Sequence, residues 1–255
     1  MKLINDTGVA FTREMAPELR QPAGLIFNMM LPFLFLALFA PLLSSMGDVG
    51  QGSESHWQWF APGILVLLGL SGTAGAGAAL LNEMVSGAFE RMLVTPMSRG
   101  AMLVGRTLKE VVILLAQALL IIAILLPTGF HLYPLGALAG LVLLTVFGVG
   151  IGALSFTLAI HSKKQQTLFY GIQQVAFFPL LLLSGVLLPI TEDSAPTWLY
   201  VLSRINPVTY VVEAERHLFA GRFAEVSVLY GTIAAVAIAV LGVAVGIRGM
   251  RNATV

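Results

Sequence analysis

Five long stretches of the sequence contain no Asp, Glu, Lys or Arg. They cover residues 21–47, 55–82, 111–162, 165–191 and 226–247. A helix that crosses the hydrocarbon core of a bilayer needs about 20 mostly apolar residues, so each stretch is long enough to cross once. The third stretch has 52 residues and a turn-like centre, PTGFHLYP, which predicts two helices there.

These stretches predict an all-α polytopic membrane protein with six transmembrane helices, which together form a single transmembrane domain over residues 1–255. The predicted spans lie near residues 23–45, 59–82, 107–127, 135–160, 167–189 and 226–247. Composition agrees, because 57% of the residues are hydrophobic and only 11% are charged, whereas soluble domains carry about 25% charged residues. The net charge of +1 lacks the basic excess of a nucleic-acid-binding protein.

Lysine and arginine in the loops predict the orientation, because cytoplasmic loops are enriched in both. An even number of spans puts both termini on one side, and that side carries eleven of the cations: Lys2, Arg13, Arg20, Arg91, Arg99, Arg106, Lys109, Lys163, Lys164, Arg248 and Arg251. The other side carries three: Arg204, Arg216 and Arg222. We therefore expect both termini, and the loop between the second and third spans, in the cytoplasm.

That cytoplasmic loop, residues 83–110, contains a short amphipathic pattern. Its apolar residues recur every four positions and form one helical stripe: Val85, Phe89 and Leu93. Glu90 and Arg91 fall off this stripe, and Pro96 disfavours helix at Thr95. The pattern predicts a short helix across the inner face, which either rests on lipid headgroups or docks a cytoplasmic partner.

The external segment 190–225 is too apolar for a simple linker. Apolar residues at helical spacing over 198–205 and again from 208 predict two short helices. Helix-breaking residues delimit them and the end of the fifth span: Ser184, Gly185, Pro189, Asn206 and Pro207. Broken helices at membrane depth must be buried in protein or line a cavity. The two helices therefore form either a structured cap or a re-entrant pair that covers an exit path.

Four amide side chains lie inside the predicted spans, and none of the four is ionisable. They are Asn28, Gln117, Gln173 and Gln174. They either bond helices to one another or line a substrate path, for which Phe177 and Phe178 would supply apolar walls. Because proton relays need ionisable groups at depth, this composition argues against a proton-driven carrier.

Motifs for nucleotide, metal or covalent chemistry are missing from the sequence. It has no G-x-x-x-x-G-K-[ST], no G-x-S-x-G and no cysteine, and its four histidines are scattered. The glycine-rich stretches SGTAGAGA at 71–78 and GVGIGA at 148–153 lie inside apolar runs, where small residues allow close helix packing. We expect a chain that is not an enzyme, holds no metal and binds no ATP itself.

The stretch NEMVSGAFERMLVTPMSR at 82–99 resembles the signature of ABC-2-type exporter permeases, roughly E-x-x-x-G-[TS]-x-E-x-L-x-x-[ST]-P after the second span. Glu83, Gly87, Glu90, Thr95 and Pro96 match it, and Arg91 and Leu93 match its commonest form. SGVLLP at 184–189 followed by NPVTY at 206–210 resembles the second half of the signature. FTREMAPELRQP at 11–22 resembles the family's amphipathic connecting helix. The chain is most similar to the daunorubicin-resistance branch.

The resemblance implies a mechanism. Two permease chains pair, as a homodimer or with a paralogue, and two cytoplasmic P-loop ATPase subunits bind beneath them and hold the ATP and Mg. Residues 85–95 match the coupling helix that passes the ATPase movement to the spans. The outer gate would comprise Ser184, Gly185, Pro189, Asn206, Pro207 and Tyr210. The cargo would be a drug, antibiotic or lipid-like molecule that leaves across the bacterial cytoplasmic membrane.

Two residues depart from the family pattern, and three other functions stay open. Ala88 replaces the usual Thr or Ser, and Pro17 lies inside the connecting helix, where it is expected to break or kink it.

Within the family, the cargo could instead be a polysaccharide or lipid-linked glycan. Outside it, the chain could be a membrane-embedded lipid-modifying enzyme that uses Glu213 and Glu215, or an ATP-independent channel or carrier.

Overall fold

The computed structural model describes residues 2–20, 23–45, 56–93, 99–192 and 195–252, and every regular element among them is a helix, which confirms the all-α fold. The helices of the first half are α1 (Lys2–Arg20), α2 (Ala23–Ser45), α3 (His56–Ala74), α4 (Ala76–Val85), α5 (Ala88–Leu93) and α6 (Arg99–Leu125). Those of the second half are the 3-10 turn η1 (Leu126–Thr128), α7 (Pro134–His161), α8 (Gln166–Leu182), α9 (Thr197–Ile205), α10 (Pro207–Phe219) and α11 (Val226–Asn252).

Four stretches of the described chain are long and apolar enough to cross a membrane: Trp57–Val85, Gly100–Thr128, Pro134–His161 and Val226–Gly249. A fifth is the pair Asn5–Arg20 and Ala23–Phe39, which are bent by 74° to one another. The predicted span near 167–189 is helical only as α8, which has 17 residues and ends at Leu182. The structure thus supports four or five spans, and the sixth is not confirmed.

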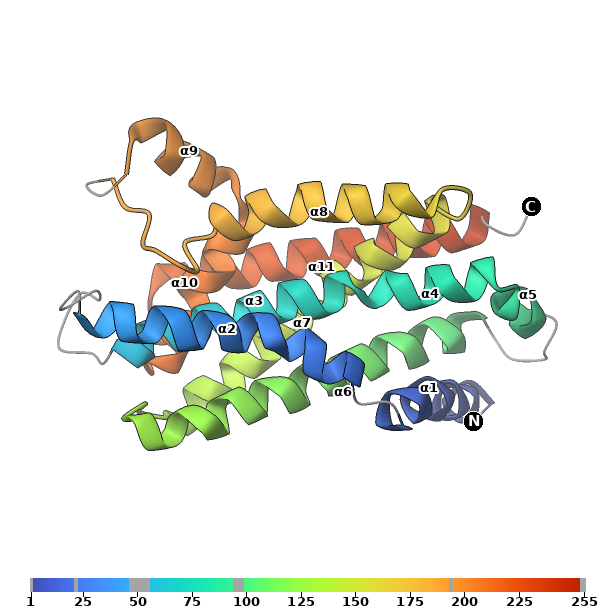
Figure 1. Ribbon diagram of the computed structural model, residues 1–255, viewed down its shortest axis with the longest axis horizontal. Helices are drawn as coiled ribbons and strands as arrows, with labels where there is room; N and C mark the ends of the chain where they lie inside the picture. Colours follow the sequence, from blue (N-terminus) through green and yellow to red (C-terminus); the bar gives the residue numbers. More distant parts are fainter. Residues whose placement is uncertain (1, 21–22, 46–55, 94–98, 193–194, 253–255) are drawn as a thin grey trace.

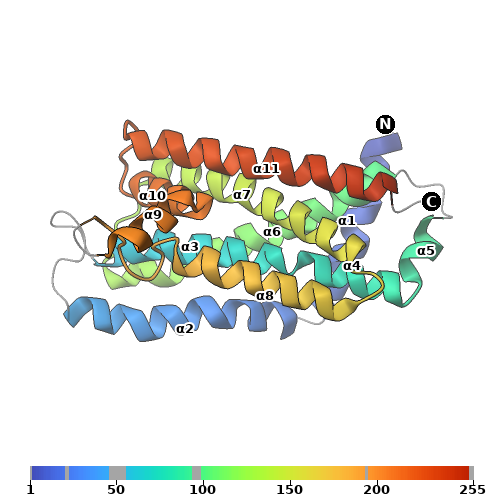
Figure 2. The same cartoon turned by 90° about the horizontal axis from the view of Figure 1, so that it is seen from above.

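The long helices form one elongated bundle with distinct ends (Figures 1 and 2). α1 and α5 lie at one end, together with the last turns of α11, and α9 and α10 lie at the other. α1 crosses the end of the bundle instead of continuing α2 (Figure 1). We call these the α5 end and the α10 end. The first helix and the last turns of the final helix therefore lie at the same end of the bundle (Figure 1).

Helix α3 forms the centre of the bundle and is surrounded by α2, α6, α7, α8 and α10. Every residue from Phe60 to Leu70 is buried, which is the pattern of a helix that is apolar on all sides. The turn predicted at 127–134 is confirmed. There α6 ends in η1, Gly129 adopts a φ of 87°, and Pro134 starts α7. Proline suits the first helical position, because its missing N–H needs no partner there.

The glycine-rich stretches pack helices closely, as predicted. A Cβ built on Gly77 of α4 would lie 2.3 Å from the Ser155 carbonyl oxygen on α7. One built on Gly242 of α11 would lie 2.4 Å from the Gly150 oxygen on α7. The backbones therefore touch directly at these points. Ser155 Oγ fastens the first contact, since it accepts a hydrogen bond from the Gly77 amide at 2.9 Å and donates one to the Ala74 oxygen.

Gly77→Ala is expected to destabilise the chain, because the new methyl group would force α4 and α7 apart. Overpacking of this kind costs about 1–3 kcal/mol. Gly72→Ala is the matched control, since a Cβ there meets nothing within 4 Å. The thermal unfolding midpoint of the detergent-solubilised protein measures both. A Gly77→Ala midpoint equal to that of Gly72→Ala would contradict the close packing.

Helix α1 runs from Lys2 to Arg20 with Pro17 inside it, so Pro17 does not break the helix. Pro17 is exposed, and it removes only the one backbone N–H that would bond the carbonyl four residues earlier. The helix is held from outside instead. A Cβ on Gly105 of α6 would lie 2.6 Å from the Ala10 Cβ, so α1 packs directly on the α6 backbone.

Candidate functional site

The predicted coupling helix over 85–95 is divided in the structure, which corrects the single apolar stripe. Helix α4 ends at Val85, Ser86 and Gly87 form a turn, and α5 starts at Ala88. Gly87 has a φ of 71°, a conformation that costs glycine little and other residues more. The matching glycine is therefore the corner between two helices. This corner turns α5 away from the axis of α4 (Figure 1).

The corner separates the residues of the predicted stripe. Val85 is exposed, whereas Phe89 packs inward against a cluster of buried side chains from α4, α7 and α8, which includes Leu81, Phe156 and Phe169. Arg91 is exposed on α5. The side chains of Glu90 and Leu93, and all of Thr95 and Pro96, lie outside the described residues. Ala88 starts α5, where its missing hydroxyl leaves the helix intact.

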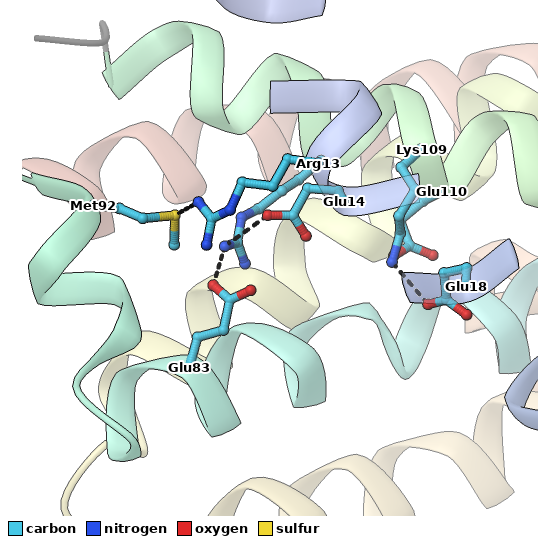
Figure 3. A network of polar contacts seen from close by, with 8 residues as sticks. Arg13, Glu14, Glu18, Glu83, Met92, Lys109 and Glu110 are labelled. Carbon is cyan, nitrogen blue, oxygen red and sulfur yellow. Dashed lines mark hydrogen bonds and ion pairs between the residues drawn. The ribbon is translucent and has the colours of Figure 1, made fainter. Parts of the chain in front are cut away.

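A group of ionic side chains joins three helices, α1, α4 and α6, at the α5 end (Figure 3). We call it the Arg106 cluster; its members are Glu14, Glu18, Glu83, Arg106, Lys109 and Glu110. The Arg106 guanidinium of α6 is 5% exposed and pairs through Nη2 with Oε1 of Glu14 on α1 at 3.0 Å and with Oε2 of Glu83 on α4. One buried cation thus bonds α1 and α4 to α6.

Lys109, one turn further along α6, extends the cluster. Its Nζ donates to Oε1 of Glu18 on α1 at 3.1 Å and lies 2.9 Å from Oε1 of Glu110. Arg13 of α1 also contacts α5, since its guanidinium donates to the Met92 sulfur (Figure 3). α1, α4, α5 and α6 are therefore bound into one unit. Displacing α5 must pull on α1 and α6 through these bonds or break them.

The sequence counted Arg106 and Lys109 as loop cations, and the structure shows them inside α6 and buried. Glu83 matches the family signature, and its carboxylate bonds within the chain. The spacing within each helix could have suggested that these side chains form ion pairs. Arg106 and Lys109 are three residues apart on one face of α6, and Glu14 and Glu18 are four residues apart on one face of α1. Pairing between distant helices still needs the fold.

The α10 end is closed by a second set of bonds, between α10 and the turn that follows α8. We call α9, α10 and residues 183–190 the α9–α10 cap. Asn206 Nδ2 donates to the Leu180 oxygen at 2.8 Å, and Thr209 Oγ1 donates to the Leu183 oxygen at 3.0 Å. A helix end leaves its last carbonyls without partners. Side chains of α10 supply them here.

Most of the predicted gate residues meet in this cap. Ser184 is buried and donates to the Leu181 oxygen, Gly185 makes the turn with a φ of 70°, and Pro207 begins α10. Asn206 also accepts from the Val208 amide at 3.0 Å and so caps α10. Tyr210 donates to the Arg204 oxygen on α9 at 2.8 Å. Pro189 lies in the half-buried turn.

Two arginines, which the sequence identified only as external cations, hold the cap in place. Arg216 of α10 donates to the Trp59 oxygen at 3.0 Å and to the Gly185 oxygen at 2.8 Å, and its guanidinium lies 3.8 Å from the Trp59 ring centroid. Arg204 pairs with Glu213 at 2.9 Å. Arg216 therefore ties α10 to α3 and to the turn after α8.

Asn206→Ala is expected to loosen the cap, because it removes both the N-cap of α10 and the donor to the Leu180 oxygen. Together these losses cost about 2 kcal/mol. Asn206→Ser restores the N-cap of α10 with a shorter side chain that cannot reach the Leu180 oxygen. Its unfolding midpoint should therefore lie between those of the wild type and Asn206→Ala. Gln174→Ala, which removes an exposed amide, is the control. Equal midpoints for all three variants would refute this role for Asn206.

The proposed path residues fall into two places. Gln173 and Phe177 line a groove of about 140 Å³ between α3, α7 and α8, which is otherwise almost entirely apolar. Asn28 and Gln117 line a smaller cavity of about 30 Å³ beside the Arg106 cluster, and Gln117 donates to the Leu25 oxygen on α2 at 3.3 Å. Gln174 and Phe178 are exposed on α8. The structure does not join these residues into one path.

Comparison with known proteins assigns the chain to a family. The family described as ABC-2 type transporter matches residues 6–220, which include the Arg106 cluster and α10. The chain belongs to the ABC-2 type transporter family. It is a multi-pass membrane protein, and its relatives are permeases, the membrane subunits of ABC transporters.

Relatives of this permease include proteins named for drug resistance. The daunorubicin resistance ABC transporter permease protein DrrB1 of Streptomyces coeruleorubidus is 25% identical over 206 residues, which cover 78% of this chain and 70% of that protein. DrrC of Mycobacterium tuberculosis, whose name refers to doxorubicin resistance, is 24% identical over 75% of this chain and 68% of its own length. The protein ycf38 of Cyanophora paradoxa, whose name describes a transport permease, is 29% identical over 79% and 69%.

In this permease, the carboxylates suggested for an enzyme do not converge on a cleft. Glu213 pairs with Arg204, and Glu215 is completely buried against α7. A lipid-modifying site would need an acid or base that substrate can reach. The two residues therefore give no support to the lipid-modifying alternative.

Proposed function

We propose that the permease is the transmembrane subunit of an ATP-driven exporter that moves a hydrophobic or amphipathic molecule out across the plasma membrane. Two copies, or one copy and a paralogue, pair in the membrane, and two P-loop ATPase subunits bind ATP and Mg beneath them. The α5 end faces the cytoplasm. The observation that carries this proposal is the bonded unit of α1, α4, α5 and α6 at that end.

The contacts of α5 supply a route for movement. When the ATPase subunits close, they displace α5 on its Gly87 corner. Phe89 passes this displacement to α7 and α8 through their shared apolar cluster. Met92 passes it to α1 through Arg13, and the Arg106 cluster passes it from α1 and α4 to α6. The spans can then change their relative positions without any covalent chemistry in this chain.

The groove between α3, α7 and α8 favours an amphipathic cargo over a hydrated glycan. Leu70, Ile151, Leu154 and Phe177 are among its apolar walls. Gln173 has no hydrogen bond within the described residues and could bond a polar group of the cargo. Binding sites for drug-like molecules combine apolar walls with few polar groups in this way. The drug names of two relatives agree with this class.

Capture of the ATPase tests the proposed partner. The permease is co-expressed with a candidate P-loop ATPase from the same genome, and the ATPase that co-purifies with it is quantified. Arg91→Glu reverses an exposed charge on α5 and is expected to lower the recovered ATPase severalfold. Lys164→Glu makes the same reversal in the α7–α8 turn, outside α5, and should not. If the ATPase is fully recovered with Arg91→Glu and lost with Lys164→Glu, its docking surface does not lie on α5.

A further inference from the structure

Glu215 lies in the centre of the α9–α10 cap and has no partner for its charge. Its residue is 0% exposed, and neither carboxylate oxygen has a hydrogen-bond partner within the described residues. Across the interface, a Cβ built on Gly140 of α7 would lie 2.5 Å from Oε2 and 2.5 Å from the Phe219 ring. The backbone of α7 therefore covers the carboxyl group directly.

None of the described side chains around it brings a compensating charge. The ionisable side chains that α9, α10 and α11 carry at this end are Tyr200, Arg204, Tyr210, Glu213, Arg216, His217 and Tyr230. Arg204 pairs with Glu213, and Arg216 bonds backbone carbonyls. The side chain that α3 buries here is the neutral Gln58, and α7 presents Gly140. Burial alone raises the pKa of the Glu215 carboxyl well above its usual value of 4.5.

We propose that Glu215 is a proton-binding site of the cap, protonated while α10 packs on α7 and ionised once α10 moves away. An isolated carboxylate is too costly to bury, so the packed cap holds the neutral acid. Opening lets water reach Oε1 and Oε2. The O–H bond then breaks, its electron pair stays on the carboxylate, and the proton passes to water. This proton exchange goes beyond ATP-driven export and needs no ATPase to be observed.

The linkage fixes the sign of the pH effect. The packed state has the raised pKa and the open state the ordinary one, so the packed state binds the proton more tightly. Low pH therefore favours the packed cap. As pH rises between the two pKa values, opening increases by at most about tenfold per pH unit. Above the raised pKa both states are ionised, and opening no longer changes with pH.

Cysteine labelling of the purified permease in detergent measures this directly, because the chain has no cysteine of its own. Val211→Cys places a thiol at a site on α10 that is 0% exposed, and Phe223→Cys places one on an exposed residue just beyond α10. The maleimide labelling rate at residue 211, divided by that at residue 223, removes the pH dependence of the thiol itself. The ratio then reports opening of the cap.

With Glu215 present, the ratio is expected to rise with pH, by up to about tenfold per unit. Glu215→Gln keeps the shape and cannot titrate, so its ratio should stay constant. Glu215→Met is apolar and of similar length, and its ratio should also stay constant with pH. This variant serves as the test if the buried amide of Glu215→Gln prevents folding. Glu213→Gln, which alters a charge paired with Arg204, should keep the rise. A ratio that is flat with Glu215, or that still rises in both Glu215 variants, overturns the proposal.

Discussion

Arg106→Met is expected to destabilise the permease by about 3–5 kcal/mol, because it leaves two largely buried carboxylates without their shared cation. The side chains of Arg106 and Glu14 are 6% and 12% exposed, so water offers little compensation. α1 would separate from α6, and the unit that joins α5 to the spans would lose its centre. The thermal unfolding midpoint in detergent and the protease sensitivity of α1 measure the two effects.

A neutralised cluster separates lost charge balance from lost packing. Arg106→Met combined with Glu14→Gln and Glu83→Gln removes the unpaired charges and should recover most of the stability, since apolar and neutral replacements of buried ion pairs are often tolerated. Arg91→Met, at an exposed arginine of α5, should leave the midpoint unchanged. A single Arg106→Met variant as stable as wild type would contradict the role assigned to the cluster.

Phe89→Asp is expected to reduce ATP-driven transport by about tenfold or more, equivalent to at least about 1.4 kcal/mol of coupling. Phe89 fills the space between α5 and the cluster of α4, α7 and α8, and a carboxylate cannot remain there unpaired. α5 would leave the bundle, and its displacement would no longer reach the spans. Transport is measured as drug accumulation in inside-out membrane vesicles that contain permease and ATPase.

Controls for Phe89→Asp address insertion and packing. The variant should reach the membrane in normal amounts, because α5 lies outside the stretches that cross it. Phe89→Leu keeps an apolar side chain in the cluster and should retain most of the transport. Full transport with Phe89→Asp would mean that movement enters the bundle by another route.

The sequence predicted the long helices well because apolar windows and breaker residues decide them locally. The turn at 127–134 and the two helices on either side of Asn206-Pro207 were confirmed for this reason. Glycine packing at 71–78 and 148–153 was also confirmed, since small residues in apolar runs have few other uses. These features depend on neighbours in the chain and not on distant partners.

The details of the site depended on contacts that the sequence does not display. The match to the signature placed Gly87 inside one continuous helix. Its positive φ instead makes it the corner between α4 and α5, where the predicted stripe divides. Pro17 was expected to disrupt α1, but the helix continues through it, and α1 packs on α6 and forms ion pairs with it. The burial of Arg106 and Glu215 could not be predicted from the charge-free windows, because it results from contacts between helices far apart in sequence.

ATP-dependent accumulation of a panel of hydrophobic and amphipathic molecules, with daunorubicin among them, in inside-out vesicles tests the central claim most directly. Vesicles carry the permease alone, the ATPase alone, or both, and each is measured with and without ATP. The account predicts accumulation only with both proteins and ATP, and its loss when the P-loop lysine of the ATPase is replaced by alanine. Accumulation by the permease alone, or accumulation that is equal with and without ATP, would contradict it.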